Sequence, residues 1–142
     1  MVTDAQGSVG RGDASLNIVE FPCDDSGEAA VAATMTRIIV NLPATDDDIY
    51  ATGNFDGDIW GTVDDMYKLT KLSDGCYYID LELTSGQIVQ FFRNNAGYAD
   101  WWRGQATNTA GSDATANFNV DANSNGNTVK LFYAYWREEP SN

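Results

Sequence analysis

The chain has 142 residues, of which 21 are acidic and 8 are basic, so its formal net charge is −13. This length fits one domain and is long enough to bury a hydrophobic core. Phosphate backbones and anionic lipid headgroups repel so acidic a chain, which argues against nucleic acid partners and against membrane binding or insertion. The charge suits an exported or surface-exposed protein, or one that binds an uncharged ligand, although solubility alone also explains it.

The sequence contains no histidine. Histidine is the commonest metal ligand and the usual general base near neutral pH, so its absence excludes Ser-His and Cys-His catalysis. The two cysteines, Cys23 and Cys76, lack the spacing of metal ligands. They are open to pairing in an exported protein, but the loose composition around Cys23 favours two free thiols. We therefore expect no metal site and no cofactor.

Residues 1–35 are predicted to form a flexible leader or linker with one possible edge strand at 15–21. From residue 36 onward, short apolar segments recur roughly every 8–12 residues between Gly, Asn and Asp turn signals. Strands are predicted at 36–43, 48–53, 66–72, 76–84, 87–94, 99–104, 115–121 and 128–136. No segment has a helical period. The prediction for residues 36–142 is an all-β fold, an antiparallel, immunoglobulin-like β-sandwich.

Alternation within these segments indicates which side chains enter the core. Tyr77, Ile79 and Leu81 share one face of the segment 76–84, and a second stripe is formed by Val129, Leu131 and Tyr133. Trp101 and Trp102 are adjacent in the predicted strand 99–104, where neighbouring side chains point to opposite faces. We therefore expect one indole of the pair in the core and the other on the surface.

The acidic turns are further candidates for a metal or catalytic site. The segment DANSNGN at 121–127 matches the start of an EF-hand loop, but its twelfth position is Phe132, where a bidentate Glu belongs. We expect a hairpin turn there, with Asn and Gly supplying positive φ. Carboxylates at 46–48 and 54–58 are interpreted as solvated turns. A glycosidase needs two carboxylates across a cleft, which a small sandwich rarely offers, so we expect no enzyme.

Four segments in order form a recognisable pattern. The segment IYATGNFDGDIW (49–60) has a strand, a Gly, a small polar residue, Phe and then Trp, and 67–86 contains an Asp-Gly hairpin signature. VQFFRNNAGYADWW (89–102) and NGNTVKLFYAYW (125–136) follow. The pattern resembles the starch- and glycogen-binding modules of carbohydrate-binding module families 20 and 48, and the similar SusE/SusF-type surface starch-binding domains.

The resemblance implies a set of sugar contacts. In the family, one Trp comes from the first motif and one from the loop after a Y-K-F strand, which correspond here to Trp60 and to one of the adjacent pair. Gln90 takes the place of the family's Lys, so this contact is neutral, and the first motif is lengthened by residues 57–59. The candidate substrate-binding residues are Trp60, Gln90, Arg93, Tyr98, Trp101, Trp102, Asn125 and Asn127.

The resemblance also implies a function. A flat indole covers the apolar face of a sugar ring, while neutral amides bond its hydroxyls. We therefore expect a non-catalytic module that binds an α-glucan such as starch or glycogen, located outside the cell or on its surface. The alternative is a structural or adhesion β-sandwich of a bacterial surface protein, in which the tryptophans are buried and no sugar binds. The oligomeric state is left open.

Overall fold

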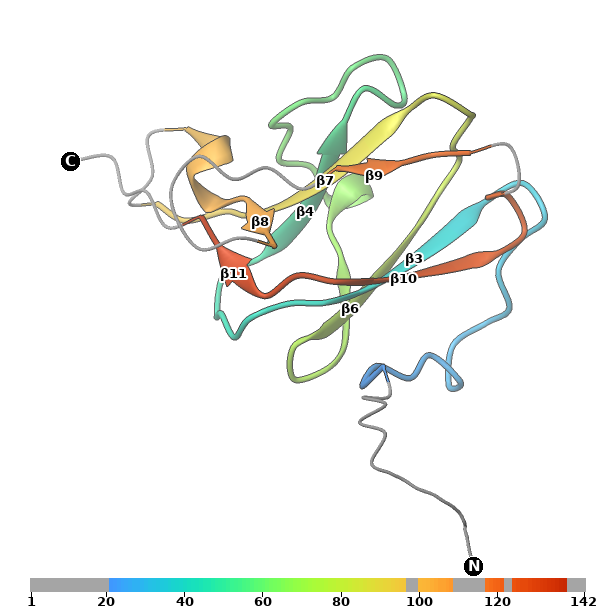
Figure 1. Ribbon diagram of the computed structural model, residues 1–142, viewed down its shortest axis with the longest axis horizontal. Coiled ribbons are helices and arrows are strands. Elements are labelled where there is room, and N and C mark those ends of the chain that lie inside the picture. Colours follow the sequence, from blue (N-terminus) through green and yellow to red (C-terminus); the bar gives the residue numbers. More distant parts are fainter. Residues whose placement is uncertain (1–20, 97–99, 109–116, 122–123, 138–142) are drawn as a thin grey trace, which may run out of the picture.

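A computed structural model describes residues 21–96, 100–108, 117–121 and 124–137 (Figure 1). The predicted edge strand at 15–21 falls almost entirely outside these residues. The described elements are two short 3₁₀ helices and a series of strands. In chain order they are β3 (Thr36–Asn41), β4 (Ile49–Gly53), η1 (Asp65–Tyr67), β5 (Thr70–Ser73), β6 (Cys76–Leu81), β7 (Ile88–Arg93), η2 (Trp101–Gly104), β8 (Ala106–Thr107), β9 (Phe118–Asn119), β10 (Thr128–Phe132) and β11 (Tyr135–Trp136).

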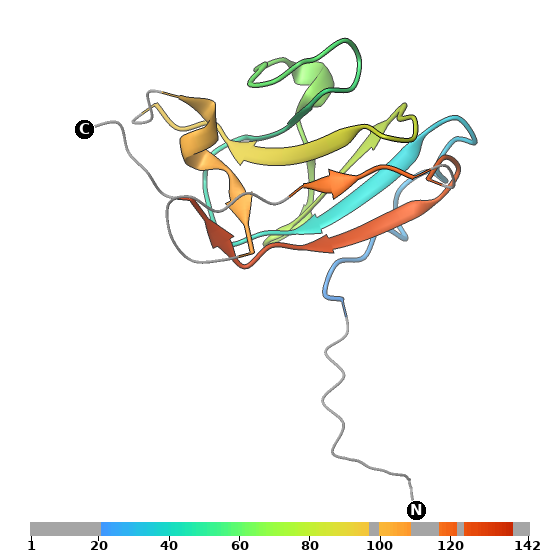
Figure 2. The same cartoon turned by 45° about the horizontal axis from the view of Figure 1, so that its top comes forward.

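The strands form two facing layers (Figure 2). One sheet has the strand order β10-β3-β6-β5 and the other has the order β4-β7-β9, while β11 and β8 form a small separate pair. Strand β10 runs parallel to β3, and the other strand pairs of the described residues are antiparallel. The predicted all-β sandwich is confirmed, with one parallel pair added; its immunoglobulin-like topology stays a prediction.

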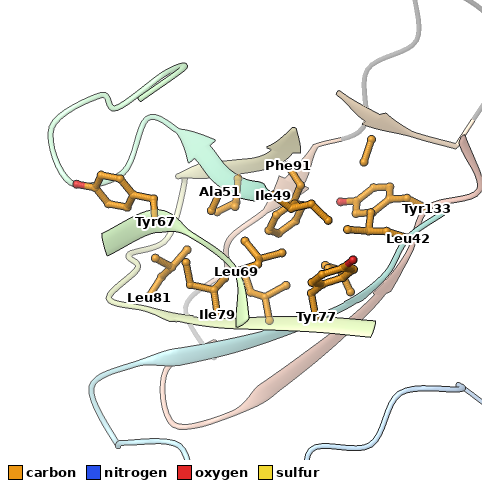
Figure 3. Packing of buried hydrophobic residues seen from close by; sticks show 14 of the residues in the cluster. Leu42, Ile49, Ala51, Tyr67, Leu69, Tyr77, Ile79, Leu81, Phe91 and Tyr133 are labelled. Atoms are coloured by element: carbon orange, nitrogen blue, oxygen red, sulfur yellow. The ribbon is translucent and has the colours of Figure 1, made fainter. Parts of the chain in front are cut away.

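The core lies between the two layers (Figure 3). Alternate residues of each strand point into it, because side chains in a strand alternate between faces. The predicted stripe of Tyr77, Ile79 and Leu81 is buried there and faces Phe91 of the opposite sheet. In the second predicted stripe Tyr133 is buried and Leu131 is partly buried. The alternating pattern therefore identified most of the inward face of the first sheet.

The prediction of a strand at 99–104 was wrong. Residues Trp101–Gly104 form η2, with 3₁₀-type hydrogen bonds from the Arg103 N–H to the Asp100 carbonyl and from the Gln105 N–H to the Trp102 carbonyl. The segment covers β7 from outside instead of extending a sheet. The predicted strand at 66–72 also divides, because its start belongs to η1 and its end to β5.

The turn at 124–127 does not close a hairpin, so the prediction of a hairpin turn at 121–127 was wrong. Gly126 does have positive φ, at 81°. However, β9 before the turn pairs with β7, whereas β10 after it pairs with β3. The turn therefore carries the chain from one sheet to the other. The Gly126 N–H donates to the Met35 carbonyl at 2.7 Å, which fixes the turn against the chain just before β3.

Cys23 and Cys76 form a disulfide, so the preference for free thiols was wrong. The bond joins the segment before β3 to the first residue of β6, on the outer face of the four-stranded sheet. Both sulfurs pack with Ile39 in a small second hydrophobic cluster. Residues 21–28, predicted to be part of a flexible leader, are therefore fastened to the sheet; the domain boundary at residue 35 stays a prediction.

A buried guanidinium strengthens the same attachment. Arg37 has a side-chain exposure of 5%; its Nε lies 2.8 Å from Asp80 Oδ1 and its Nη1 lies 3.0 Å from Asp25 Oδ2. Its guanidinium also lies over the Tyr78 ring, 4.8 Å from the centroid. A buried charge is tolerated when it is paired and hydrogen-bonded. Asp25 is thus the second carboxylate, after Asp80, that pairs with the buried charge of Arg37 in β3.

Candidate functional site

The outer face of the β4–β7 pair carries aromatic side chains. Ala51 and Phe91 point into the core, so their strand neighbours Tyr50 and Phe92 point outward. The ring centroids of Tyr50 and Phe92 are 5.7 Å apart with an interplanar angle of 26°. Trp101 from η2 packs on Phe92 at 5.6 Å in an edge-to-face arrangement. This face of the sheet is thus covered by η2, which lies in the segment predicted to be a strand.

Trp60 completes this row of rings at its solvent end. Its centroid lies 5.9 Å from that of Trp101 at an interplanar angle of 29°, and 40% of its surface is exposed. Such offset stacking is a favourable geometry for two aromatic rings. Trp60, Trp101, Phe92 and Tyr50 are called the aromatic row below. The structure brings together two of the predicted contacts, Trp60 and Trp101, from segments about forty residues apart in the sequence.

The segment between β4 and η1 places Trp60 beside β4. Phe55 is 1% exposed and anchors the loop in the core. Gly53 packs so closely against the neighbouring strand β7 that an added Cβ would lie 2.0 Å from the Ile88 carbonyl oxygen. The Ile59 N–H then donates to the Gly53 carbonyl at 2.9 Å. The chain therefore turns back along the edge of β4 that faces away from β7, which brings Trp60 next to the outer face of the sheet.

A cleft of about 280 Å³ lies beside Trp101. It is lined by Gly61, Val63, Phe92, Arg93, Asn94, Asn95, Asp100 and Trp101. One wall is therefore aromatic, and the rest offers two amides, a carboxylate and a guanidinium. Asn95 Nδ2 donates to Asp47 Oδ2 at 3.0 Å, which orients that amide. Arg93, a predicted contact, lies at this cleft with its guanidinium 5.2 Å from the centroid of the Trp136 ring.

Two further predicted residues lie close to the aromatic row but not in it. Trp102 is partly buried between two guanidinium groups, with Arg103 4.5 Å and Arg137 4.6 Å from its ring centroid. Gln90 is only 7% exposed; its Nε2 donates to Asn117 Oδ1, and its Oε1 accepts from Gln105 Nε2. The predicted sugar contact of Gln90 stays a prediction, but its amide is engaged inside the protein.

Asn125 and Asn127 lie far from the aromatic row. They belong to the turn before β10, at the opposite end of the molecule from η2 (Figures 1 and 2). Asn125 Oδ1 accepts a hydrogen bond from Thr36 Oγ1 at 3.2 Å. These two candidates are not brought together with Trp60 and Trp101. Tyr98 lies outside the described residues.

Two tyrosines near the Trp60 loop, Tyr50 of β4 and Tyr67 of η1, have raised pKa values. Burial raises the pKa of Tyr50. In the Trp60 loop, the Tyr67 hydroxyl donates to Asp56 Oδ2 at 2.5 Å, and this hydrogen bond raises the pKa of Tyr67 to about 12. Both phenols therefore stay protonated at neutral pH and act as hydrogen-bonding and packing groups.

The sequence analysis missed Asn94, Asn95 and Asp100. A signal for Asn94 was present, since the [DN] position of the family's Y-K-F-x-x-[DN] motif falls on it. Asp100 carries no such signal, because its place in the cleft depends on how η2 folds back on β7. Gly61 was missed for the same reason: its role depends on a contact with Trp101.

The described residues contain neither a cluster of metal ligands nor a membrane-spanning helix. No group of three or more His, Cys, Asp or Glu side chains in this part of the chain is arranged to hold a metal ion. None of its helices has the length and hydropathy needed to cross a membrane.

No family model matches this chain. It is 31% identical over 91 residues to an alpha-amylase from Niallia circulans, and the match covers 64% of this chain but only 6% of that protein. Among solved structures, it is similar to the glucoamylase of Hormoconis resinae, with a TM-score of 0.48 and 14% identity; the match covers 71% of this chain and 17% of the glucoamylase. This chain thus spans a small part of each protein that it resembles.

Proposed function

We propose that this chain is a non-catalytic module that binds α-glucans of the starch and glycogen type. The binding surface is the exposed edge of the aromatic row, Trp60 and Trp101, together with the adjoining cleft. The observation that carries the proposal is the stacking of these two indoles, one of them 40% exposed, beside a cleft rich in amides.

Sugar chemistry matches this surface. Each glucose ring has an apolar face of C–H groups, and covering it with an indole removes apolar area from water. The hydroxyl rim of the ring then needs donors and acceptors, which Asn94, Asn95 and Asp100 supply at the cleft. A helical α-glucan has a curved surface, and we infer that it rests on the exposed part of Trp60 while its hydroxyls reach the cleft beside Trp101. An uncharged ligand also meets no repulsion from a net charge of −13.

The sequence similarity to an alpha-amylase makes starch-like glucans the first sugars to test. The match covers only 6% of that enzyme, which is compatible with a small accessory module. We infer that the module itself does not hydrolyse the glucan, because Asp100 is the one carboxylate among the described residues that line the cleft, whereas a glycosidase uses two.

We also infer an extracellular or cell-surface location. Disulfides persist in oxidising compartments, and the bond between Cys23 and Cys76 fits such a location.

Calorimetric titration of the protein with maltoheptaose tests the proposal. We expect a saturable heat of binding with maltoheptaose and no heat with a β-linked cello-oligosaccharide of equal length, because the flat β-linked chain lacks the curvature of the α-glucan. Saturable binding of the β-linked chain alone would contradict the α-glucan assignment. No heat with either sugar would contradict the proposal and favour the structural or adhesion alternative.

A further inference from the structure

We propose that Thr52 and Gly61 are positioning residues that hold Trp60 and Trp101 in their stacked arrangement before any sugar arrives. This inference rests on the proposed function for its consequence, since the stacked pair is the proposed sugar platform. Neither residue belongs to the set of predicted contacts; Thr52 is fully buried, and Gly61 lines the cleft with its backbone.

Thr52 fixes the backbone on both sides of Trp60. Its side chain is fully buried on the outer face of β4. Its Oγ1 accepts a hydrogen bond from the Gly61 N–H at 2.7 Å and donates to the Ile59 carbonyl at 3.5 Å. Ile59 and Gly61 are the two neighbours of Trp60 in the chain. One buried hydroxyl therefore holds the short segment that carries the exposed indole.

Gly61 fixes the position of Trp101. Its φ is +72°, a backbone conformation that residues other than glycine rarely adopt. A Cβ on Gly61 would lie 2.4 Å from Trp101 Cδ1 and 2.8 Å from its Nε1. The indole of Trp101 is thus seated directly on the backbone next to Trp60. Any larger residue at this position must move the indole or the loop.

The combined effect is a rigid platform. Trp101 is confined between Gly61 and Phe92, and Trp60 is confined by the bonds of its neighbours to Thr52. A binding surface that is already ordered loses less conformational entropy when a ligand binds, so its affinity is higher for the same contacts. The hydroxyl of Thr52 and the missing side chain of Gly61 therefore act on affinity through the two indoles.

Paired variants test the role of the hydroxyl. Thr52→Val keeps the shape of the side chain but removes the hydroxyl, whereas Thr52→Ser keeps the hydroxyl. Stacked indoles produce an exciton couplet in circular dichroism, which reports their geometry without any sugar. We expect Thr52→Val to lose most of the couplet and to bind maltoheptaose roughly tenfold more weakly. Thr52→Ser is expected to retain both properties.

A second pair of variants tests Gly61 against a matched glycine. Gly57 lies in the same loop with φ of +83°, but a Cβ there would have no atom within 4 Å. Gly61→Ala and Gly57→Ala therefore impose similar backbone strain, and only the first places an atom against Trp101. We expect the couplet to be lost in Gly61→Ala and kept in Gly57→Ala, with thermal unfolding confirming that both variants are folded.

The outcomes separate this inference from the proposed function. A full couplet in Thr52→Val and Gly61→Ala, or equal losses in Gly61→Ala and Gly57→Ala, would overturn the positioning role. If the wild type binds no maltoheptaose while the couplet changes as expected, the proposed function fails and the positioning role stands. If maltoheptaose binds the wild type and Thr52→Val equally well despite a lost couplet, the consequence for affinity is overturned.

Discussion

Replacing Trp60 by alanine is expected to weaken maltoheptaose binding by roughly thirtyfold or more, equivalent to about 2 kcal/mol, the loss typical of a central aromatic contact. Trp60 forms the exposed end of the aromatic row, so its removal takes away the outer half of the proposed platform. Because 40% of its surface is already exposed, the temperature of unfolding is expected to change little. Calorimetric titration and thermal unfolding of the same sample measure both effects.

Phe132 provides a matched control for this experiment. It is also an exposed aromatic residue, with 60% of its surface accessible, but it lies on β10 in the other sheet. Phe132→Ala is expected to bind maltoheptaose as the wild type does. Equal losses of affinity in Trp60→Ala and Phe132→Ala would show that the effect is not specific to the aromatic row. Unchanged affinity in Trp60→Ala would place the sugar elsewhere.

Removing the disulfide with the double substitution Cys23→Ala and Cys76→Ala is expected to lower the free energy of unfolding by about 2–4 kcal/mol. The bond closes a loop with a sequence separation of 53 residues, which restricts the unfolded chain. It also holds Asp25 near the buried guanidinium of Arg37, where the two groups form an ion pair at 3.0 Å. Urea unfolding followed by far-ultraviolet circular dichroism measures the loss.

Sugar affinity is the internal control for the disulfide variant. The disulfide lies on the outer face of the four-stranded sheet, whereas the aromatic row lies on the outer face of the other sheet. Maltoheptaose is therefore expected to bind the folded double variant with wild-type affinity. A reductant should lower the stability of the wild type and leave the variant unaffected. Equal stability of the two proteins in the absence of reductant would contradict the expected contribution of the bond.

The core of this fold could be predicted from the sequence because it depends on local alternation. In β6 the side chains of Tyr77, Ile79 and Leu81 repeat every second residue, which is the period of a strand with one buried face. The outer face of β4 and β7 does not show this alternation between apolar and polar residues. Tyr50 and Phe92 are apolar on the outward side as well, because η2 covers them. Their neighbours in the sequence carry no sign of that cover.

The aromatic row shows what sequence spacing could not supply. The prediction that Trp101 and Trp102 point to opposite faces assumed a strand, and the segment is a 3₁₀ helix. Such helices are short and have poorer hydrogen-bond geometry than α-helices, and in this one Trp101 packs directly against the backbone of Gly61. The family resemblance named Trp60 and one of the pair Trp101 and Trp102, but only the folded chain shows that Trp101 is the one that stacks on Trp60.

The disulfide could not be predicted from the sequence for a related reason. Pairing requires two Cα atoms at a suitable distance, and here they are 5.3 Å apart. That distance depends on the attachment of residues 21–28 to the sheet through Ile39 and Arg37. The small and acidic residues around Cys23 suggested a loose segment. Their composition does not reveal that Asp25 forms an ion pair with Arg37 or that Cys23 is buried against Ile39. Contacts between distant segments thus account for both failures.

Nuclear magnetic resonance of the four indole N–H groups, with maltoheptaose added stepwise, tests the central claim most directly. Trp136 is an internal reference, since it is 7% exposed and its Nε1 donates to the Pro43 carbonyl at 3.1 Å. We expect the indole signals of Trp60 and Trp101 to shift and saturate together, and that of Trp136, whose ring contacts Arg93 at the cleft, to shift much less. Saturating shifts confined to Trp102 or Trp136, or no shift at any sugar concentration, would contradict the claim.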